Sequence, residues 1–168
     1  MKSTESEIGQ LHDRKCFRPV HICDMTNDEQ RKAQIALAYL SEKRNGDVKG
    51  RVVYNGKPTR EYLGREDSSS PTVSLESILL TGMVDAHEDR DVMTTDIPNA
   101  FIQAPMPLRD EKVIMKITGR LVDILINMHP DTYGEYVVFE KGRKVLYVEI
   151  LMALYGICLL YTSDAADE

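Results

Sequence analysis

The chain has 168 residues and a mass of 19.1 kDa, and 42% of its residues are hydrophobic and 29% are charged. This composition predicts one globular domain with a buried core and excludes fibrous, collagen-like and wholly disordered proteins. The longest uncharged apolar stretch, residues 150–161, is much shorter than the roughly 20 residues of a membrane span, and residues 1–5 begin no signal peptide. Three cysteines are too few for a disulfide framework, so we expect an intracellular protein that is not secreted and has no membrane partner.

The formal net charge of −6 argues against general affinity for nucleic acid, but the charge is unevenly distributed. Residues 43–65 are strongly basic and residues 85–96 strongly acidic. The cations of the basic segment are Lys43, Arg44, Lys49, Arg51, Lys57, Arg60 and Arg65, and the carboxylates of the acidic segment are Asp85, Glu88, Asp89, Asp91 and Asp96. This order fits a site where phosphate meets a divalent metal, and it fits two solvated faces of opposite charge equally well.

The first quarter of the chain predicts an irregular arm followed by a helix. Residues 1–25 show no clear period. Residues 26–29, Thr-Asn-Asp-Glu, form a capping box, in which the Thr hydroxyl and the Glu carboxylate satisfy each other's backbone amides. Apolar residues at three- and four-residue steps follow, and the pair Asn45-Gly46 is a stop signal, so we expect a helix over residues 27–44.

The basic segment predicts a β-hairpin. An extended run at residues 52–54 is followed by Asn55-Gly56, the favoured pair of a type I′ turn, and by a second extended run to Leu63. The cations would therefore lie on a hairpin.

The remaining elements alternate between helix and strand. Ser70-Pro71 and the apolar residues after it predict a helix over residues 71–86, with an apolar face that packs on another element. Alternating side chains predict a strand over residues 91–97, ended by Pro98. Later elements are a strand at 112–117, a helix at 120–128, and a hairpin of residues 135–139 and 144–150. This order predicts an α+β fold with helices packed on an antiparallel sheet.

The last eleven residues, 158–168, differ from the rest of the chain. Their sequence, Cys-Leu-Leu-Tyr-Thr-Ser-Asp-Ala-Ala-Asp-Glu, resembles the translation of a sequencing adapter used in shotgun libraries. We therefore interpret this tail as an artefact and exclude it from the fold.

Residues 90–103, Arg-Asp-Val-Met-Thr-Thr-Asp-Ile-Pro-Asn-Ala-Phe-Ile-Gln, carry the most specific motif. An Asp before a proline turn is by itself more often a structural cap than a metal ligand. The whole run, however, resembles the first catalytic motif of copia-type LTR retrotransposon reverse transcriptases. Residues 49–56 are similar to the fingers hairpin of that family, residues 69–87 to the segment leading to the palm, and residues 141–157, ending in Leu-Tyr-Gly-Ile, to the stretch before the next motif.

The resemblance implies a right-hand polymerase fold, truncated to the fingers and the start of the palm, over residues 26–157. It implies that Asp96 is a catalytic carboxylate of a two-Mg²⁺ site and that Ile97 lends its backbone carbonyl to the metal. Asn99 and Ala100 would offer backbone amides near the incoming dNTP, and the Phe101 ring would exclude a 2′-hydroxyl. Core burial is an equally good explanation of Phe101.

The resemblance also implies that Arg51, and with less support Lys49, bind the triphosphate from the fingers, a task that suits a permanently charged guanidinium. A solvated hairpin charge is the alternative. The partners of such an enzyme are an RNA or DNA template–primer, a dNTP, and the remainder of the retroelement polyprotein, in a cytoplasmic virus-like particle or the nucleus.

The chain departs from the family because it contains no adjacent pair of Asp residues, which the second metal-binding motif requires. We therefore expect a fragment of the polymerase that is inactive by itself. The alternative hypothesis is a non-enzymatic nucleic-acid-binding remnant that uses residues 43–65, and a third is a small acidic interaction module. Tyr54 and Tyr62 could stack on template bases or pack across the hairpin.

Four residues near the N-terminus are a weak indication of a zinc site. His12, Cys16, His21 and Cys23 are possible ligands, but their spacing matches no standard zinc knuckle, and an ordinary loop explains them better.

Overall fold

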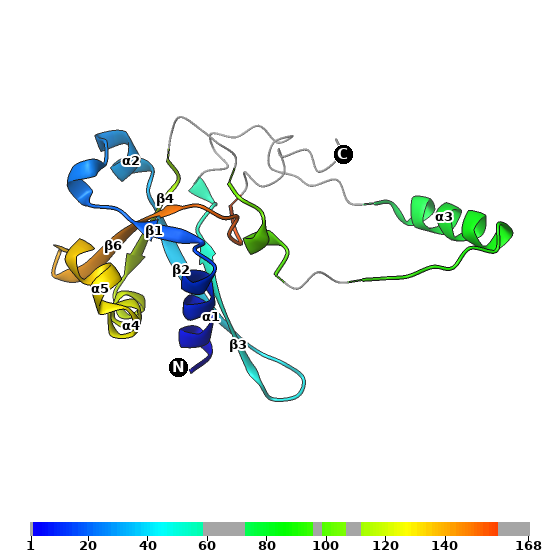
Figure 1. Cartoon of the computed structure of the whole chain (residues 1–168), viewed down its shortest axis with the longest axis horizontal. Coiled ribbons are helices and arrows are strands. Elements are labelled where there is room, and N and C mark those ends of the chain that lie inside the picture. Colours follow the sequence, from blue (N-terminus) through cyan, green and yellow to red (C-terminus); the bar gives the residue numbers. More distant parts are fainter. Residues whose placement is uncertain (1, 59–72, 96–98, 107–111, 158–168) are drawn as a thin grey trace.

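The structure, a computed structural model, describes residues 2–58, 73–95, 99–106 and 112–157 (Figure 1). The chain is α+β, with a six-stranded sheet and helices on both of its faces. The strands are β1 (Phe17–Pro19), β2 (Gln34–Glu42), β3 (Val48–Tyr54), β4 (Ile114–Thr118), β5 (Val137–Glu140) and β6 (Arg143–Ile150).

The sheet is organised around β6 in the order β1-β6-β4-β2-β3. One edge of β6 pairs with β4, and the other pairs with β5 near the start of β6 and with β1 near its end. These pairs and the β2–β3 pair are antiparallel, whereas β2 and β4 run parallel, with Gln34 opposite Met115. The expected antiparallel sheet is therefore a mixed sheet.

Helices bury a different part of the core on each face of the sheet. The helices are α1 (Lys2–Asp13), α2 (Asn27–Lys32), α3 (Leu75–His87), α4 (Arg120–Met128) and α5 (Pro130–Tyr133), with 3-10 turns at Ile22–Asp24, Phe101–Gln103 and Gly134–Tyr136. Ile8 of α1, Leu125 of α4 and Tyr133 of α5 pack with Met115 and Ile117 of β4 on one face. On the other face, Val20 and Met25 pack with Ile114, Val145 and Tyr147.

The N-terminal segment is part of this core, which differs from the irregular arm expected for residues 1–25. Ile8 and Leu11 lie three residues apart on α1 and are almost completely buried, and Cys16 and Phe17 are buried beside them. Two apolar residues were too few to reveal a helical period, although they suffice to attach α1 to the core.

The helix expected over residues 27–44 ends early. The capping box is confirmed, because the Glu29 amide donates to Thr26 Oγ1 (3.2 Å) and the Thr26 amide donates to Glu29 Oε2 (2.8 Å). The helix stops at Lys32, and β2 begins at Gln34. Pairing with β3 on one side and β4 on the other makes this segment a strand, so tertiary contacts override its helical spacing.

The hairpin of the basic segment forms earlier in the chain than predicted. Its strands are β2 and β3, and its turn contains Asn45-Gly46, where Gly46 adopts φ +84°. The Lys43 amide donates to the Asp47 carbonyl (2.7 Å), which closes the turn. Asn55-Gly56 instead follows β3, and the expected second strand falls largely on residues 59–72, outside the described part of the chain.

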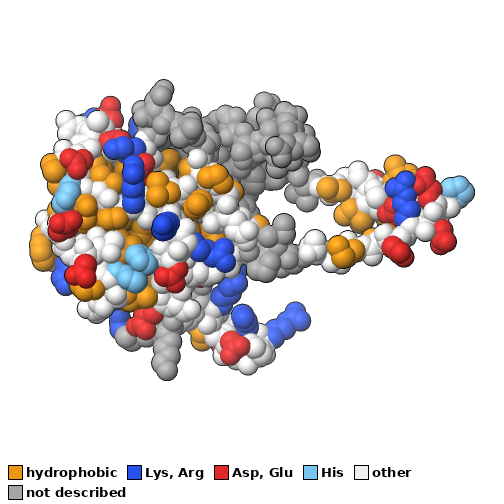
Figure 2. All heavy atoms as spheres, viewed as in Figure 1, with side chains coloured by type: hydrophobic (Ala, Val, Ile, Leu, Met, Phe, Trp, Pro, Cys, Tyr) orange, Lys and Arg blue, Asp and Glu red, His pale blue; other side chains and the backbone are white. Residues whose placement is uncertain are grey.

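Helix α3 projects away from the sheet (Figure 1). It begins after Ser74, whose hydroxyl accepts from the Ser77 amide, rather than after Ser70. None of its residues is buried, so the expected packing of its apolar face does not occur among the described residues. Hydrophobic and charged side chains are both exposed along it in Figure 2.

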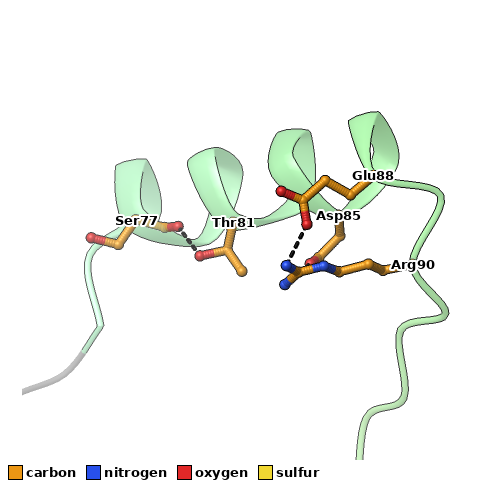
Figure 3. Close-up of polar contacts among 5 residues, drawn as sticks. All are labelled: Ser77, Thr81, Asp85, Glu88 and Arg90. Carbon is orange, nitrogen blue, oxygen red and sulfur yellow. Dashed lines mark hydrogen bonds and ion pairs between the residues drawn. The ribbon is translucent and has the colours of Figure 1, made fainter.

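The acidic segment lies at the far end of this helix. Arg90 forms ion pairs with Glu88 and, at 3.8 Å, with Asp85, and Thr81 donates to the Ser77 carbonyl (Figure 3). Residues 91–95 are exposed and form no strand, contrary to the strand expected over 91–97. The basic hairpin and this acidic helix end lie far apart in Figure 1, so they do not form one joint site.

The C-terminal predictions are confirmed. Strand β4 lies within two residues of its expected position, α4 has the expected bounds, and β5 and β6 form the expected hairpin around Lys141-Gly142. Pro130 ends α4 and also begins α5, in line with the preference of proline for the first helical turn. No helix in the described part of the chain is both long and apolar enough to cross a membrane.

The exposure of α3 leads to a stability prediction. Leu79→Ala should change the free energy of unfolding by less than about 0.5 kcal/mol, because no described residue covers Leu79 (59% exposed). Leu125→Ala in α4, where the side chain is 0% exposed, should cost about 2–5 kcal/mol. Urea unfolding followed by far-UV circular dichroism measures both. A comparable loss in the two variants would contradict the exposed position of α3.

Candidate nucleotide-binding site

Residues 151–157, which follow β6, join three segments that are distant in the sequence. The Leu151 amide donates to the Cys16 carbonyl (2.9 Å), and the Ala153 amide to the Ala104 carbonyl (2.8 Å). The Tyr54 amide at the end of β3 donates to the Tyr155 carbonyl (2.9 Å). The Leu-Tyr-Gly stretch therefore lies against both the basic hairpin and the segment that follows the Asp96 motif.

Gly156 permits this close contact. Its φ is +90°, a backbone conformation that residues with a side chain rarely adopt. A Cβ atom at this position would overlap the Tyr54 carbonyl oxygen. Glycine is thus required both by the turn and by the approach of β3.

Arg51 lies on the exposed face of β3, beside this junction. Its guanidinium carbon lies 5.3 Å from the centre of the Tyr155 ring, close enough for a cation–π contact. Across the hairpin Arg51 is paired with Tyr39, and Lys49 is paired with Ser41. All four of these hairpin side chains are exposed, and lysine and arginine side chains gather over this hairpin in Figure 2. This exposed hairpin face could bind an anion such as a phosphate.

The free edge of β3 is covered by α1. Ser3 Oγ donates to the Val48 carbonyl (2.7 Å), and the Gly50 backbone lies so close to Ser3 that a Cβ would crowd it. Such a cover protects a sheet edge from pairing with another chain.

Glu7 of α1 places a carboxylate near the two hairpin cations. Burial raises the pKa of this carboxyl, whereas a hydrogen bond from the Val52 backbone and the charges of Lys49 and Arg51 lower it by less. Glu7, Lys43 and Lys49 also line a shallow, open hollow of about 400 Å³ between α1 and the hairpin. The face that carries Arg51 is therefore more suited to an anion than the side that faces α1.

The predicted residues of the first motif are only partly described. Asp96 and Ile97, the expected metal ligands, lie outside the described residues, as does the side chain of Phe101. Asn99 adopts φ +56°, a conformation that asparagine tolerates well, and Ala100 is exposed. The Ala100 carbonyl accepts from the Gln103 amide (3.1 Å) in the 3-10 turn Phe101–Gln103. Because the Ala153 amide donates to the Ala104 carbonyl (2.8 Å), the end of this motif lies close to the Leu-Tyr-Gly stretch.

Local sequence patterns do not indicate that Tyr39, Glu7 and Tyr155 are neighbours of Arg51. Tyr39 lies in the segment expected to be a helix and Glu7 in the expected irregular arm, because pairing with β3 is a long-range property that local patterns do not encode. Tyr54, a candidate for base stacking, is buried at 5% exposure and packs in the core, so it cannot stack on a template. Tyr62 lies outside the described residues.

The four possible zinc ligands are not brought together. His21 stacks on Tyr136, with ring centres 4.1 Å apart, and His12 stacks on His129, at 3.6 Å. Cys16 is buried, and its pKa is raised to about 11 by burial, whereas Cys23 is exposed.

A polar network lies beside α2, on the face of the sheet opposite to the face that α1 and α4 cover. Lys116 Nζ donates to Glu140 Oε2, and the Tyr147 hydroxyl donates to Glu140 Oε1 (2.5 Å). These two hydrogen bonds, that from Lys116 first, lower the pKa of the Glu140 carboxyl. Glu140 thus joins strands β4, β5 and β6 through side chains.

The Gly156 contact leads to a prediction with a matched control. Gly156→Ala and Gly46→Ala both place a side chain at a positive φ, but a Cβ at position 46 meets no atom within 4 Å. Gly46→Ala should cost about 1–2 kcal/mol from its backbone conformation. Gly156→Ala should cost about 1–3 kcal/mol more, because of the overlap with Tyr54. Equal losses in urea unfolding would show that β3 does not approach Gly156.

The Glu140 network predicts a pH dependence. Because the folded pKa lies below the unfolded value, the ionised carboxylate stabilises the fold above about pH 4.5, and this stabilisation is lost as the pH falls through the folded pKa. The stability gap between the wild type and Glu140→Gln should therefore be full at pH 7 and shrink below about pH 4.5. Thermal unfolding from pH 3 to pH 7 measures the gap. A gap that is independent of pH would contradict the network.

No protein-family model, no curated protein and no solved structure matches this chain.

Proposed function

We propose that the chain is the fingers and first part of the palm of a copia-type RNA-directed DNA polymerase. The observation that supports this proposal best is the junction at residues 151–157. Three stretches that resemble separate motifs of the family, at residues 49–56, 90–103 and 141–157, meet or lie close together there, although the chain separates them widely. A nucleotide site in such an enzyme needs the same three stretches to converge.

Arg51 is the described residue whose position best suits the proposed role. Its side chain is exposed, and its guanidinium lies against the Tyr155 ring. The residue opposite Arg51 on β2 is Tyr39, which carries no carboxylate. Stacking on a ring leaves the N–H groups at the rim of the guanidinium directed outward, where they can donate to phosphate oxygens. Lys49 lies two residues earlier on the same exposed face and would add positive charge.

Asp96 and Ile97 would hold Mg²⁺ in this proposal, and Asn99, Ala100 and Phe101 would contact the nucleotide. A carboxylate and a backbone carbonyl are oxygen ligands of the kind that Mg²⁺ prefers. When bound, the metal neutralises charge on the triphosphate during transfer. One carboxylate is too few for a two-metal site, so we propose no DNA synthesis by this chain alone.

A second candidate function rests on the exposed face of the hairpin. Tyr39 lies opposite Arg51 on the face that also carries Lys49, and Lys43 and Arg44 add charge at the turn. Aromatic and basic side chains on one face are typical of surfaces that bind single-stranded nucleic acid. A binding remnant would use this surface without needing Asp96.

Nucleotide binding distinguishes the two functions. In the polymerase proposal, the full chain binds mant-dATP in the presence of Mg²⁺, and fluorescence anisotropy reports the affinity. Arg51→Ala and Asp96→Asn should each weaken this binding by about tenfold or more, because each removes a charged partner of the triphosphate or its metal. Arg143→Ala, an exposed arginine at the start of β6, is the matched control and should bind as the wild type does.

The opposite result is equally specific. The binding remnant would be favoured if labelled single-stranded RNA binds with a strong salt dependence. Arg51→Ala would then weaken this binding, and Asp96→Asn would leave it unchanged. If mant-dATP binding also proves independent of Mg²⁺, the polymerase proposal is contradicted.

A further inference from the structure

A cluster of two histidines and one aspartate lies on the side of the molecule where α1 and α4 end. Among the residues that the structure describes, one possible ligand atom each from His12, Asp13 and His129 lies within 4.8 Å of the others. Proposed nucleotide contacts involve none of these residues. We propose that they form a binding site for a divalent transition metal such as Zn²⁺.

The packing of two helices brings the three residues together. Helix α1 ends at Asp13, α4 ends at Met128, and His129 is the residue that caps α4. Gly9 of α1 lies so close to Met128 that a Cβ there would overlap the end of the methionine side chain. Leu11 and Leu125, both buried, belong to the same core cluster beneath this contact. Two helix C-termini are thus fixed side by side, each with a histidine at its end.

Tyr133 fixes the orientation of the first histidine. Its hydroxyl lies 2.7 Å from His12 Nδ1, and its ring is 1% exposed and packed in the core. In the tautomer in which Nδ1 donates to this hydroxyl, the lone pair of His12 is on Nε2, where a metal can bind it. Metal-bound histidines are commonly held by such a hydrogen bond from the other ring nitrogen.

The donor set favours zinc and similar ions over magnesium. Imidazole nitrogens suit Zn²⁺, Cu²⁺ and Ni²⁺, whereas Mg²⁺ prefers oxygen ligands alone. Metal–ligand bonds of about 2.0–2.2 Å require ligand atoms roughly 3.3 Å apart, so the ligand atoms, now within 4.8 Å of one another, have to approach by at most about 1.5 Å. Asp13 is exposed and the stacked rings of His12 and His129 are only partly buried, which allows this movement. Three protein ligands leave one position for water.

Calorimetric titration of the full, tag-free chain with ZnCl₂ after dialysis against a chelator tests the proposal. We expect one Zn²⁺ per chain and a higher melting temperature with Zn²⁺, because the metal joins α1 to the α4–α5 junction. Co²⁺ in place of Zn²⁺ should give visible d–d absorption bands, and an excess of MgCl₂ should not displace Zn²⁺ from this site. Asp13→Asn and His129→Gln should each lower the Zn²⁺ affinity by at least about tenfold.

Two controls separate this site from other possible ligands. His21→Gln and Cys23→Ser alter a histidine outside the cluster and the exposed thiol near the N-terminus, and both should leave Zn²⁺ binding unchanged. Far-UV circular dichroism establishes that Asp13→Asn, a change at an exposed position, folds as the wild type does. The proposal is overturned if the wild type does not bind Zn²⁺, or if it binds equally well with both Asp13 and His129 replaced.

Discussion

The fold depends on the hydrogen bonds made by the backbone of residues 151–157. This short segment contacts the N-terminal part at Cys16, the stretch before Met106, and the end of β3 at Tyr54. Each contact joins segments whose association costs the entropy of closing a long loop, so the contacts stabilise one another once one has formed. Glycine is the one residue type that position 156 allows beside the end of β3, because both the φ of Gly156 and its distance from the Tyr54 carbonyl exclude a side chain.

This junction also determines which charges are exposed. Helix α1 covers the free edge of β3 and brings Glu7 near the hairpin cations, while the opposite face of the hairpin presents Arg51, Lys49 and Tyr39 to solvent. Tyr155 supports the guanidinium from the junction itself. A proposed phosphate contact at Arg51 and the position of the Leu-Tyr-Gly stretch are therefore consequences of the same packing. Helix α3 lies outside this arrangement and carries its acidic end away from the hairpin.

The elements that could be predicted from the sequence are those that local signals define. The capping box at Thr26, the bounds of α4 and the hairpin of β5 and β6 are encoded by residues close together in the chain. The two Asn-Gly pairs at 45–46 and 55–56 carry the same local signal, and only the pairing of β2 with β3 and β4 decides which of them forms the hairpin turn. In the candidate site, the sequence indicated Arg51, but its contact with Tyr155 and the nearness of Glu7 arise from long-range packing.

Native-state hydrogen exchange at the amides of Tyr54, Met106 and Ala153 is the most direct measurement of the junction. These amides donate to Tyr155, Leu151 and Ala104. If the junction holds the fold together, they exchange as slowly as the amides of the β4–β6 pair, through unfolding of the whole domain. If they exchange as quickly as exposed turn amides while β4 and β6 remain protected, the three segments do not converge at residues 151–157.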